Sequence, residues 1–244
     1  MLSALVPSQT IDFSRSKGNS GKGILPASES ANTIAENTIN PVTRAAISLE
    51  YASLRHHRHC PTGMYVIPSS ATILVWEVAF FVHQGYYADS ILKFELTFPN
   101  NYPEKPPAVR FLIDIFHPLI APTTGAFTLA PRFRPWRPKE HHIFDVLHWI
   151  KASFKKSVLD KLNDFDCLNK EAFKSVPYRD NTSSFAALAT QSSKLSQSPS
   201  ALYDSTGPRK GSSALRFSKL KPEHAVATRE KLGLQLWSDP AEIK

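Results

Sequence analysis

Apolar positions follow a helical period at the start of the domain and a strand period after it. Behind Pro41, residues 42–54 carry apolar side chains at helical spacing, which predicts an amphipathic helix that ends before Pro61. In a later run, residues 91–98, apolar and polar residues alternate, so one face of that strand should be buried and the other solvated. In all, runs bounded by Gly, Pro, Asn or Asp predict strands at residues 64–67, 73–82, 91–98 and 109–113.

Helical spacing returns after an irregular, Pro-rich stretch at residues 116–138. Residues 143–154 place apolar side chains on one side and predict a helix, and shorter helices are expected at residues 169–176 and 182–195. The short connections between the predicted strands favour an antiparallel meander. A helix, a four-stranded meander, a long loop and closing helices together predict an α+β fold.

Changes in composition along the chain predict the domain boundaries. Residues 1–40 are rich in Ser, Thr, Asn and Gly and bury too little apolar surface to offset chain entropy, so a flexible tail is expected there. The core domain is assigned to residues 41–195, and the Ser-, Pro- and Gly-rich residues 196–214 are assigned as a linker. Residues 215–244 regain apolar side chains, so this C-terminal segment is expected to dock on the core or on a partner.

Charge, hydropathy and cysteine content narrow the functional classes. The formal net charge is +8, but the basic residues are spread along the chain without a dense run, so nucleic-acid binding is not expected. No stretch approaches the roughly 20 apolar residues that a membrane span needs, so direct membrane insertion is not expected either. The two cysteines, Cys60 and Cys167, are too few for a disulfide framework, which fits a reducing compartment such as the cytosol or the nucleus. The clustered histidines His56, His57 and His59 lack an acidic or cysteine partner at ligand spacing, so neither a metal nor another cofactor is expected.

Two short strings in the Pro-rich region carry a family resemblance. Residues 101–111 read Asn-Tyr-Pro-Glu-Lys-Pro-Pro-Ala-Val-Arg-Phe, and residues 115–118 read Ile-Phe-His-Pro. The prolines fix φ and remove hydrogen-bond donors, which suits the crossing between the third and fourth predicted strands. In order and spacing, these strings and Trp136 resemble the signatures of the ubiquitin-conjugating enzyme (E2) fold over residues 49–176. The alternative, a Pro-rich turn between two ordinary strands, would require several separate features to coincide.

The same resemblance implies that the catalytic groups are missing. Active members continue with His-Pro-Asn and then Gly-x-[Ile/Val]-Cys-Leu, whereas this chain places Leu119 at the asparagine position and Thr128 at the cysteine position. Thioester transfer needs a thiolate, and a missing oxyanion donor typically costs about 10²–10³ in rate. His117 matches a histidine that family members use structurally. Neither Cys60 nor Cys167 is expected to reach the loop, so the implied catalytic set is empty.

Further strings resemble one catalytically inactive group, the fused-toes or Akt-interacting-protein family, which includes the insect crossbronx proteins. They are residues 61–69 (Pro-Thr-Gly-Met-Tyr-Val-Ile-Pro-Ser), the Gly-Tyr-Tyr turn at residues 85–87, residues 142–147 and the closing residues 217–232. The basic string Arg-His-His-Arg-His at residues 55–59 is a departure, since relatives carry an apolar helix end there. The resemblance implies an adaptor for Hook-type coiled-coil and FHIP-type proteins in vesicle trafficking, with links to Akt kinase and apoptosis. It also implies a cytoplasmic protein that reaches membranes through its partners, with the nucleus as a second location.

Two other functions stay open at this point. One is a ubiquitin-binding cofactor that assists an active E2, and the other is an active enzyme with a displaced cysteine. For an adaptor, exposed apolar residues around the degenerate site are the expected partner surface. They are Leu119, Ile120, Phe127, Leu129, Phe133 and Trp136. Phe217, Leu220 and Leu232 are expected either to cover these residues or to complete a groove with them for a partner helix.

Overall fold

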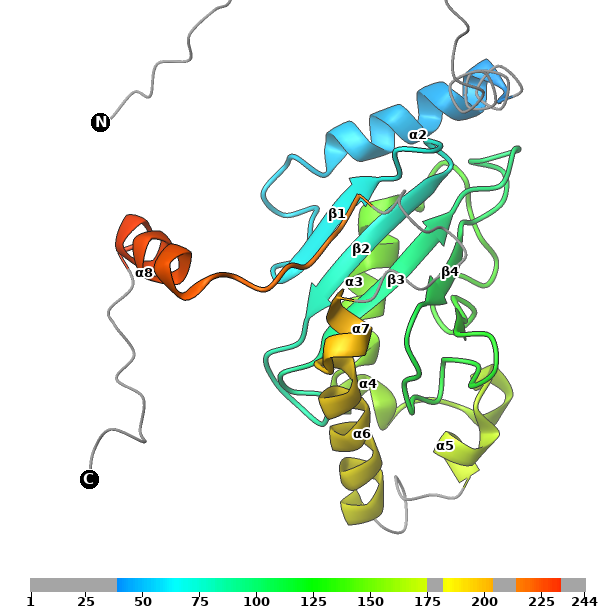
Figure 1. The fold of residues 1–244 in the computed structure, drawn as a ribbon. Helices are drawn as coiled ribbons and strands as arrows, with labels where there is room; N and C mark the ends of the chain where they lie inside the picture. The colour runs from blue at the N-terminus through cyan, green and yellow to red at the C-terminus, as the bar shows by residue number, and fades with distance from the viewer. Residues whose placement is uncertain (1–38, 175–181, 204–213, 234–244) are drawn as a thin grey trace, which may run out of the picture.

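The computed structural model describes residues 39–174, 182–203 and 214–233 (Figure 1). A first helix, an antiparallel sheet and a series of C-terminal helices follow one another along the chain, which confirms the predicted α+β class. Most of the predicted tail, residues 1–38, lies outside the described residues, as do residues 175–181, 204–213 and 234–244. The predicted domain limits therefore stay predictions.

The first helix, α2 (Pro41–Ser53), begins and ends close to its predicted bounds. The Asn40 side chain caps it by accepting a 2.9 Å hydrogen bond from Val42 N–H, and Pro41 brings a preset φ to the first helical position. The buried Thr43 hydroxyl donates to the Asn100 carbonyl at 2.8 Å, which ties the helix to the loop after the third strand.

The sheet has five antiparallel strands in the order β1-β2-β3-β4-β5. The four predicted strands are confirmed, but a fifth strand of two residues was missed because it is too short to show a period. Consecutive strands are neighbours throughout, so the sheet is a meander with β1 at one edge. The bounds are β1 (Met64–Pro68), β2 (Val75–Phe81), β3 (Ile91–Thr97), β4 (Ala108–Phe111) and β5 (Ala126–Phe127).

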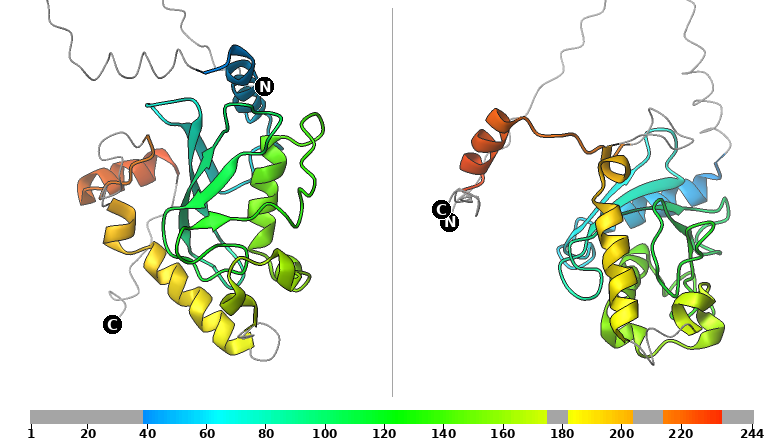
Figure 2. Two further views of the ribbon diagram at one scale, coloured as in Figure 1. Left: turned by 90° about the vertical axis from the view of Figure 1, so that its right-hand side faces the viewer. Right: turned by 60° about the horizontal axis from the view of Figure 1, so that its bottom comes forward.

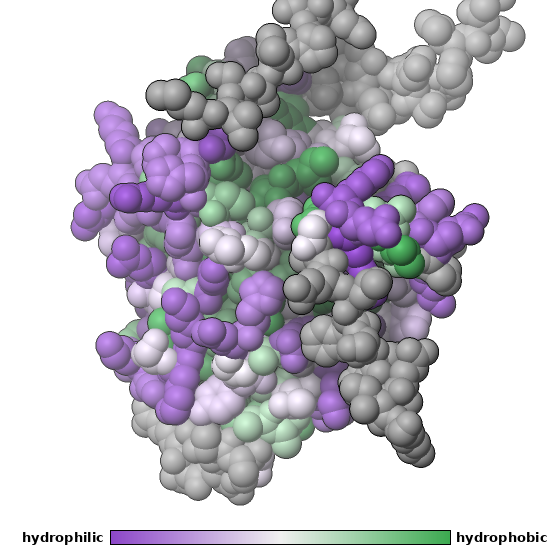
Figure 3. Space-filling model, turned by 90° about the vertical axis from the view of Figure 1, so that its left-hand side faces the viewer, coloured by the Kyte–Doolittle hydropathy of each residue, from purple (hydrophilic) through white to green (hydrophobic). Residues whose placement is uncertain are grey.

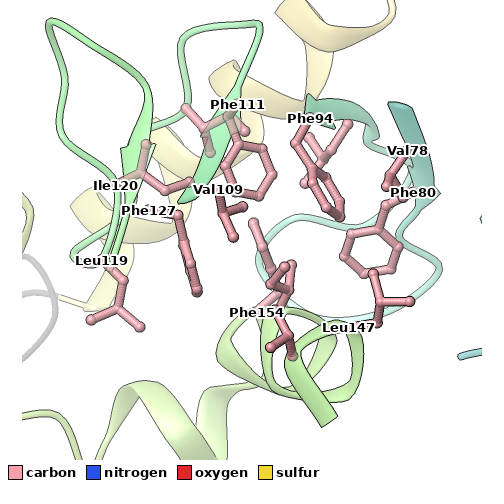
Figure 4. Close-up of a cluster of buried hydrophobic side chains, with 14 of the residues drawn as sticks. Val78, Phe80, Phe94, Val109, Phe111, Leu119, Ile120, Phe127, Leu147 and Phe154 are labelled. Atoms are coloured by element: carbon pink, nitrogen blue, oxygen red, sulfur yellow. The ribbon is translucent and has the colours of Figure 1, made fainter. Parts of the chain in front are cut away.

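The hydrophobic core lies between the inner face of the sheet and helix α3 (Ile143–Ser153), which runs behind the sheet in Figure 1. Alternate residues of β2 and β3 point to this side, as the alternating pattern of β3 predicted. Phe154 lies at the centre of an aromatic cluster, with its ring centroid 5.7 Å from that of Phe80 and 5.9 Å from that of Phe111 (Figure 4). Other core residues are Trp76, Val78, Leu92, Phe94, Leu96, Val146, Leu147 and Ile150.

Further helices close the domain beyond α3, and they range from single turns to a helix of 15 residues. They are α4 (Lys156–Leu159), the 3-10 helix η1 (Asp164–Asp166), α5 (Lys170–Lys174) and α6 (Thr182–Ser196). Helices α5 and α6 were predicted, whereas α4 and η1 are single turns without a periodic signal. Serines attach α6 to the loop after β4 and to the start of β3: Ser192 Oγ accepts from Phe116 N–H and Ser196 Oγ accepts from Ile91 N–H, each at 3.0 Å.

The outer face of the sheet carries the C-terminal part of the chain (Figure 2). Helix α7 (Pro199–Tyr203) lies within the predicted linker, which is therefore not irregular throughout, and Lys93 Nζ donates to the Ala201 and Leu202 carbonyls at 2.8 Å. Residues 214–221 continue without helix or strand over β2 and β1, and helix α8 (Pro222–Lys231) projects away from the sheet.

Candidate functional site

The loop that the resemblance marks as the degenerate active site is a short hairpin against the sheet edge at β4. Residues 120 and 127 form a bridge, and Ala121 N–H donates to the Ala126 carbonyl at 2.8 Å. Gly125 adopts a φ of +69° in the turn, and its carbonyl accepts a 2.8 Å hydrogen bond from Phe111 N–H. A Cβ at residue 125 would lie 2.2 Å from the Phe111 carbonyl oxygen. Only glycine fits there, so close packing on β4 fixes the path of the loop.

The hairpin brings together Thr128 and Leu119, the two positions that the resemblance marks as substituted. Thr128 N–H donates to the Leu119 carbonyl at 3.0 Å, so the residues at the presumed cysteine and asparagine positions are backbone neighbours. Leu119 is fully buried. The Thr128 hydroxyl oxygen accepts a 3.1 Å hydrogen bond from Ala130 N–H, a local turn that serine and threonine often make. This hydroxyl therefore stabilises the backbone that follows it.

His117 supports the loop from inside the core. Its Nδ1 accepts from Leu119 N–H at 3.0 Å, so the ring proton lies on Nε2, which donates to the Ser153 carbonyl at 3.1 Å. Complete burial lowers the pKa of His117 to about 4, against the smaller opposing effect of the Ser153 hydrogen bond. Both ring nitrogens are occupied and the ring is neutral, so His117 is not available as a general base for Thr128.

Burial of neutral His117 predicts a loss of stability in mild acid. Its folded pKa of about 4 lies below the ordinary histidine value, so the unfolded chain binds more protons between these two values. Stability should therefore fall as the pH drops from about 7 towards 4, by about 2 kcal/mol at pH 5 from this residue alone. Urea unfolding measured across this pH range should show that stability falls with pH in the parent chain and in the control variant His224→Asn, which changes a histidine on α8. The variant His117→Asn should not show this fall. An unchanged slope in His117→Asn would assign the acid sensitivity to other groups.

Neither cysteine is placed as a substitute nucleophile. Cys167 was expected to lie away from the loop, but its segment reaches it, since Asn169 N–H donates to the Pro118 carbonyl at 3.0 Å. The Cys167 thiol is itself buried, donates to the Asn163 carbonyl, and has a pKa raised to about 11 by burial. Cys60 precedes β1 and is half-buried, and burial raises the pKa of its thiol as well. Both thiols are therefore protonated at neutral pH.

The expected apolar surface around the loop is largely interior. Leu119, Ile120, Phe127 and Phe133 are all at most 7% exposed, so the prediction that they form an exposed cluster is wrong. Figure 4 shows the first three pointing into the core. Their apolar side chains complete the core where β5 and the hairpin close it. Leu129 and Trp136 remain half-buried, and the Trp136 indole N–H donates to the Pro103 carbonyl at 2.8 Å.

The C-terminal residues do not cover this loop. Phe217 lies on the outer sheet face, with its ring centroid 6.3 Å from that of Phe81 and 4.9 Å from Lys93 Nζ. Leu215 N–H donates to a carboxylate oxygen of Glu77 at 3.1 Å. Leu220 and Leu232 are exposed. The expectation that these residues pack over the degenerate site is therefore wrong, and their role in partner binding stays a prediction.

Glu50 is a polar junction that the sequence interpretation missed. One carboxylate oxygen accepts from the Tyr102 hydroxyl and lies 3.0 Å from His142 Nδ1, and the other accepts from Ile143 N–H at 3.0 Å. This carboxylate caps the N-terminus of α3 and joins it to α2 and to the Tyr-Pro string. The available signal was its position three residues after Ile47, on the inward side of α2.

Across residues 39–174, 182–203 and 214–233, no group of three or more His, Cys, Asp or Glu side chains is arranged to hold a metal ion. Within the same ranges, no helix is long and apolar enough to cross a membrane.

Comparison with known proteins matches this sequence to one family. The model of the ubiquitin-conjugating enzyme family matches residues 46–192, more than half of the chain. The chain therefore belongs to the ubiquitin-conjugating enzyme family.

Relatives with similar sequences carry the names crossbronx and AKT-interacting protein. Protein crossbronx of Drosophila virilis is 32% identical over 186 residues, which cover 72% of this chain and 74% of that protein. AKT-interacting protein of Salmo salar is 32% identical over 185 residues, 72% of this chain and 60% of that protein. Protein crossbronx-like of Drosophila mojavensis is 39% identical over 94 residues, and the match spans 38% of this chain and 37% of that protein. These relatives confirm the resemblance to the E2 variants of the fused-toes group.

Proposed function

We propose that this E2 variant is a non-catalytic adaptor. The observation that supports this most directly is the state of Thr128, whose backbone is paired with Leu119 and whose hydroxyl accepts from Ala130 N–H. A threonine nucleophile needs a base beside it, and His117 is neutral, buried and fully hydrogen-bonded. The apolar Leu119 side chain offers no donor for a developing oxyanion. With Thr128 at the cysteine position and Leu119 at the asparagine position, ubiquitin transfer has neither of its chemical groups.

The proposed partners are Hook-type coiled-coil and FHIP-type proteins in vesicle trafficking. Membership of the group that contains crossbronx and AKT-interacting protein supports this proposal. The salmon relative is named for an interaction with AKT, which supports an Akt kinase partner. The link to apoptosis rests on the fused-toes resemblance alone. The adaptor would act in the cytoplasm, reach membranes through its partners, and have the nucleus as a second location.

The exposed leucines of the C-terminal segment are the proposed contacts for a coiled coil. Leu220 is 57% exposed and Leu232 is 66% exposed, and they flank helix α8, which projects from the sheet. Apolar side chains presented in this way by a projecting helix suit the side-by-side packing of a partner helix.

Affinity capture with the full chain tests the adaptor proposal. A purified Hook-type coiled coil should be retained by the parent chain, while an active E2 should not. Leu220→Glu/Leu232→Glu should weaken retention at least tenfold, because it places charge in an apolar contact. Leu168→Glu/Leu195→Glu, which changes two other exposed leucines, is the matched control and should bind like the parent. Retention of the active E2 in place of the coiled coil would favour the ubiquitin-binding cofactor instead.

A further inference from the structure

A small hollow lies where the end of α2 meets the edge strand β1. Its volume is about 220 Å³, and its walls are Tyr51, Leu54, Arg55, Cys60 and Val66. Tyr51, Leu54, Cys60 and Val66 are partly buried and pack against the hydrophobic core, which holds these walls in place. An apolar cavity of about 150 Å³ is enough to hold a benzene ring. The hollow can therefore accept one leucine- or phenylalanine-sized side chain.

The rim of this hollow is cationic. Arg55, His56, His57 and Arg58 are all exposed on the turn that follows α2. In the ranges that the structure describes, no acidic side chain forms an ion pair with Arg55 or Arg58. The turn is the same string that departs from the apolar helix end of the fused-toes resemblance. Nothing in the fold described above uses the charges of this turn.

The turn is held in a defined conformation against α3. His56 N–H donates to the Ser53 carbonyl and His59 N–H donates to the His56 carbonyl, each at 3.0 Å. The His59 ring stacks on Phe144, with ring centroids 4.2 Å apart. His148 Nε2 lies 2.9 Å from the Arg58 carbonyl oxygen. A charged turn that is fixed in this way loses little entropy when it binds a partner.

Strand β1 borders the hollow through Val66, and part of its edge opposite β2 is open for pairing. Met64 does not belong to the open part, because its N–H donates to the Pro61 carbonyl at 3.0 Å and its carbonyl oxygen lies 3.5 Å from Cys60 Sγ. Beyond Met64, no backbone segment among the described residues is hydrogen-bonded to that edge. Figure 3 looks onto this side of the molecule, where hydrophilic side chains surround smaller hydrophobic areas. An open edge strand beside an apolar hollow is the arrangement in which an extended peptide adds to a sheet.

From these features we infer that the α2–β1 hollow binds an extended acidic peptide segment of a partner protein. One apolar side chain of the peptide fills the hollow, its backbone lies along β1, and its carboxylates face Arg55 and Arg58. This surface is separate from the exposed leucines beside α8, so the inference does not depend on the proposed coiled-coil partner.

Charge and shape favour a peptide over the other occupants of such a surface. A second copy of this chain would bring two cationic turns together, and like charges oppose that contact. A membrane surface is met by apolar side chains that protrude, whereas the apolar residues here line a concavity. An acidic peptide complements both the cationic rim and the hollow.

Selection from a random-peptide library on the full chain tests this inference. We expect enrichment of peptides in which one apolar residue is flanked by Asp and Glu. The selected peptides should bind Arg55→Glu/Arg58→Glu at least tenfold more weakly than the parent. The matched control, Lys155→Glu/Lys161→Glu, changes the net charge equally at two exposed lysines and should bind them as the parent does. Bound peptide should also slow alkylation of Cys60 in the hollow, while the buried Cys167 stays unreactive with or without peptide.

Three results would overturn the inference. The first is enrichment of peptides without acidic residues, or equal binding by the Arg55→Glu/Arg58→Glu variant. The second is selective binding of phosphatidylserine vesicles with no acidic peptide enriched, which would assign the patch to a membrane. The third is a dimer in sedimentation that the same double variant dissociates, which would assign the patch to a second copy. Because coiled-coil capture is measured separately, failure here leaves the adaptor proposal standing.

Discussion

Gly125→Ala should destabilise the fold by about 2–5 kcal/mol. A positive φ costs a residue with a side chain about 1–2 kcal/mol, and forcing an extra methyl group into packed structure costs about 1–3 kcal/mol more. The added Cβ would lie 2.2 Å from the Phe111 carbonyl oxygen, so the hairpin must move away from β4. Urea unfolding followed by tryptophan fluorescence measures the change.

Gly85→Ala is the matched control for this substitution. Gly85 also has a positive φ, of +92°, but a Cβ there would lie 3.6 Å from its nearest neighbour, an ordinary contact. Gly85→Ala should therefore lower the free energy of unfolding only by the backbone contribution of about 1–2 kcal/mol. Equal losses in the two variants would show that the close contact between the hairpin and β4 contributes nothing.

Glu50→Ala should cost about 3 kcal/mol, because it removes the acceptor shared by α2, α3 and the Tyr-Pro string. The substitution leaves the Tyr102 hydroxyl and Ile143 N–H without their partner, and each unsatisfied buried donor costs about 1–3 kcal/mol. The Glu50 side chain is 11% exposed, so water replaces it poorly. Chemical unfolding measures the loss, and Glu50→Gln should recover part of it through the remaining amide oxygen.

Glu140→Ala controls for the removal of a carboxylate as such. Glu140 forms an exposed pair with Arg137 at 2.7 Å, and exposed pairs contribute little to stability. We expect no measurable change in the unfolding midpoint for this variant. A loss of stability as large as that of Glu50→Ala would mean that the loss comes from the change in net charge and not from the hydrogen bonds of the Glu50 junction.

Hydrophobic periodicity predicted the elements that are long enough to show it. Helix α2, strands β1–β4 and helix α3 each repeat their pattern over several residues, and the structure places them close to the predicted bounds. Strand β5 has two residues and η1 has three, so neither contains a full period. Local pattern alone cannot reveal such short elements, because tertiary contacts define them.

The degenerate loop shows why the apolar character of its residues did not predict whether their side chains are exposed or buried. Leu119, Ile120 and Phe127 lie in a Pro-rich, irregular stretch, and irregular stretches usually run over the surface. Here the Gly125 turn folds the stretch back on β4 and directs these side chains into the core. The family resemblance assigned Leu119 and Thr128 to the asparagine and cysteine positions, but it gave no information on which way the side chains of the loop point.

The docking of the C-terminal segment could not be predicted from the sequence, because it depends on contacts between residues that are far apart along the chain. Phe217 meets Phe81 and Lys93 on the sheet face that alternation marked as solvated. Covering of that face by a later segment leaves no trace in the local pattern of β2 or β3. Glu50 was missed for a similar reason, since its partners come from two other parts of the chain.

The most direct test of the non-catalytic role is a thioester assay. The full chain is incubated with ubiquitin, activating enzyme and ATP beside an active E2, and the products are separated with and without reducing agent. The absence of a thiolate-forming residue at position 128, together with the protonated thiols of Cys60 and Cys167, predicts no thiol-sensitive adduct on this chain. A reducible ubiquitin adduct that disappears in Cys60→Ser or Cys167→Ser would contradict the account and restore the reading of an enzyme with a displaced cysteine.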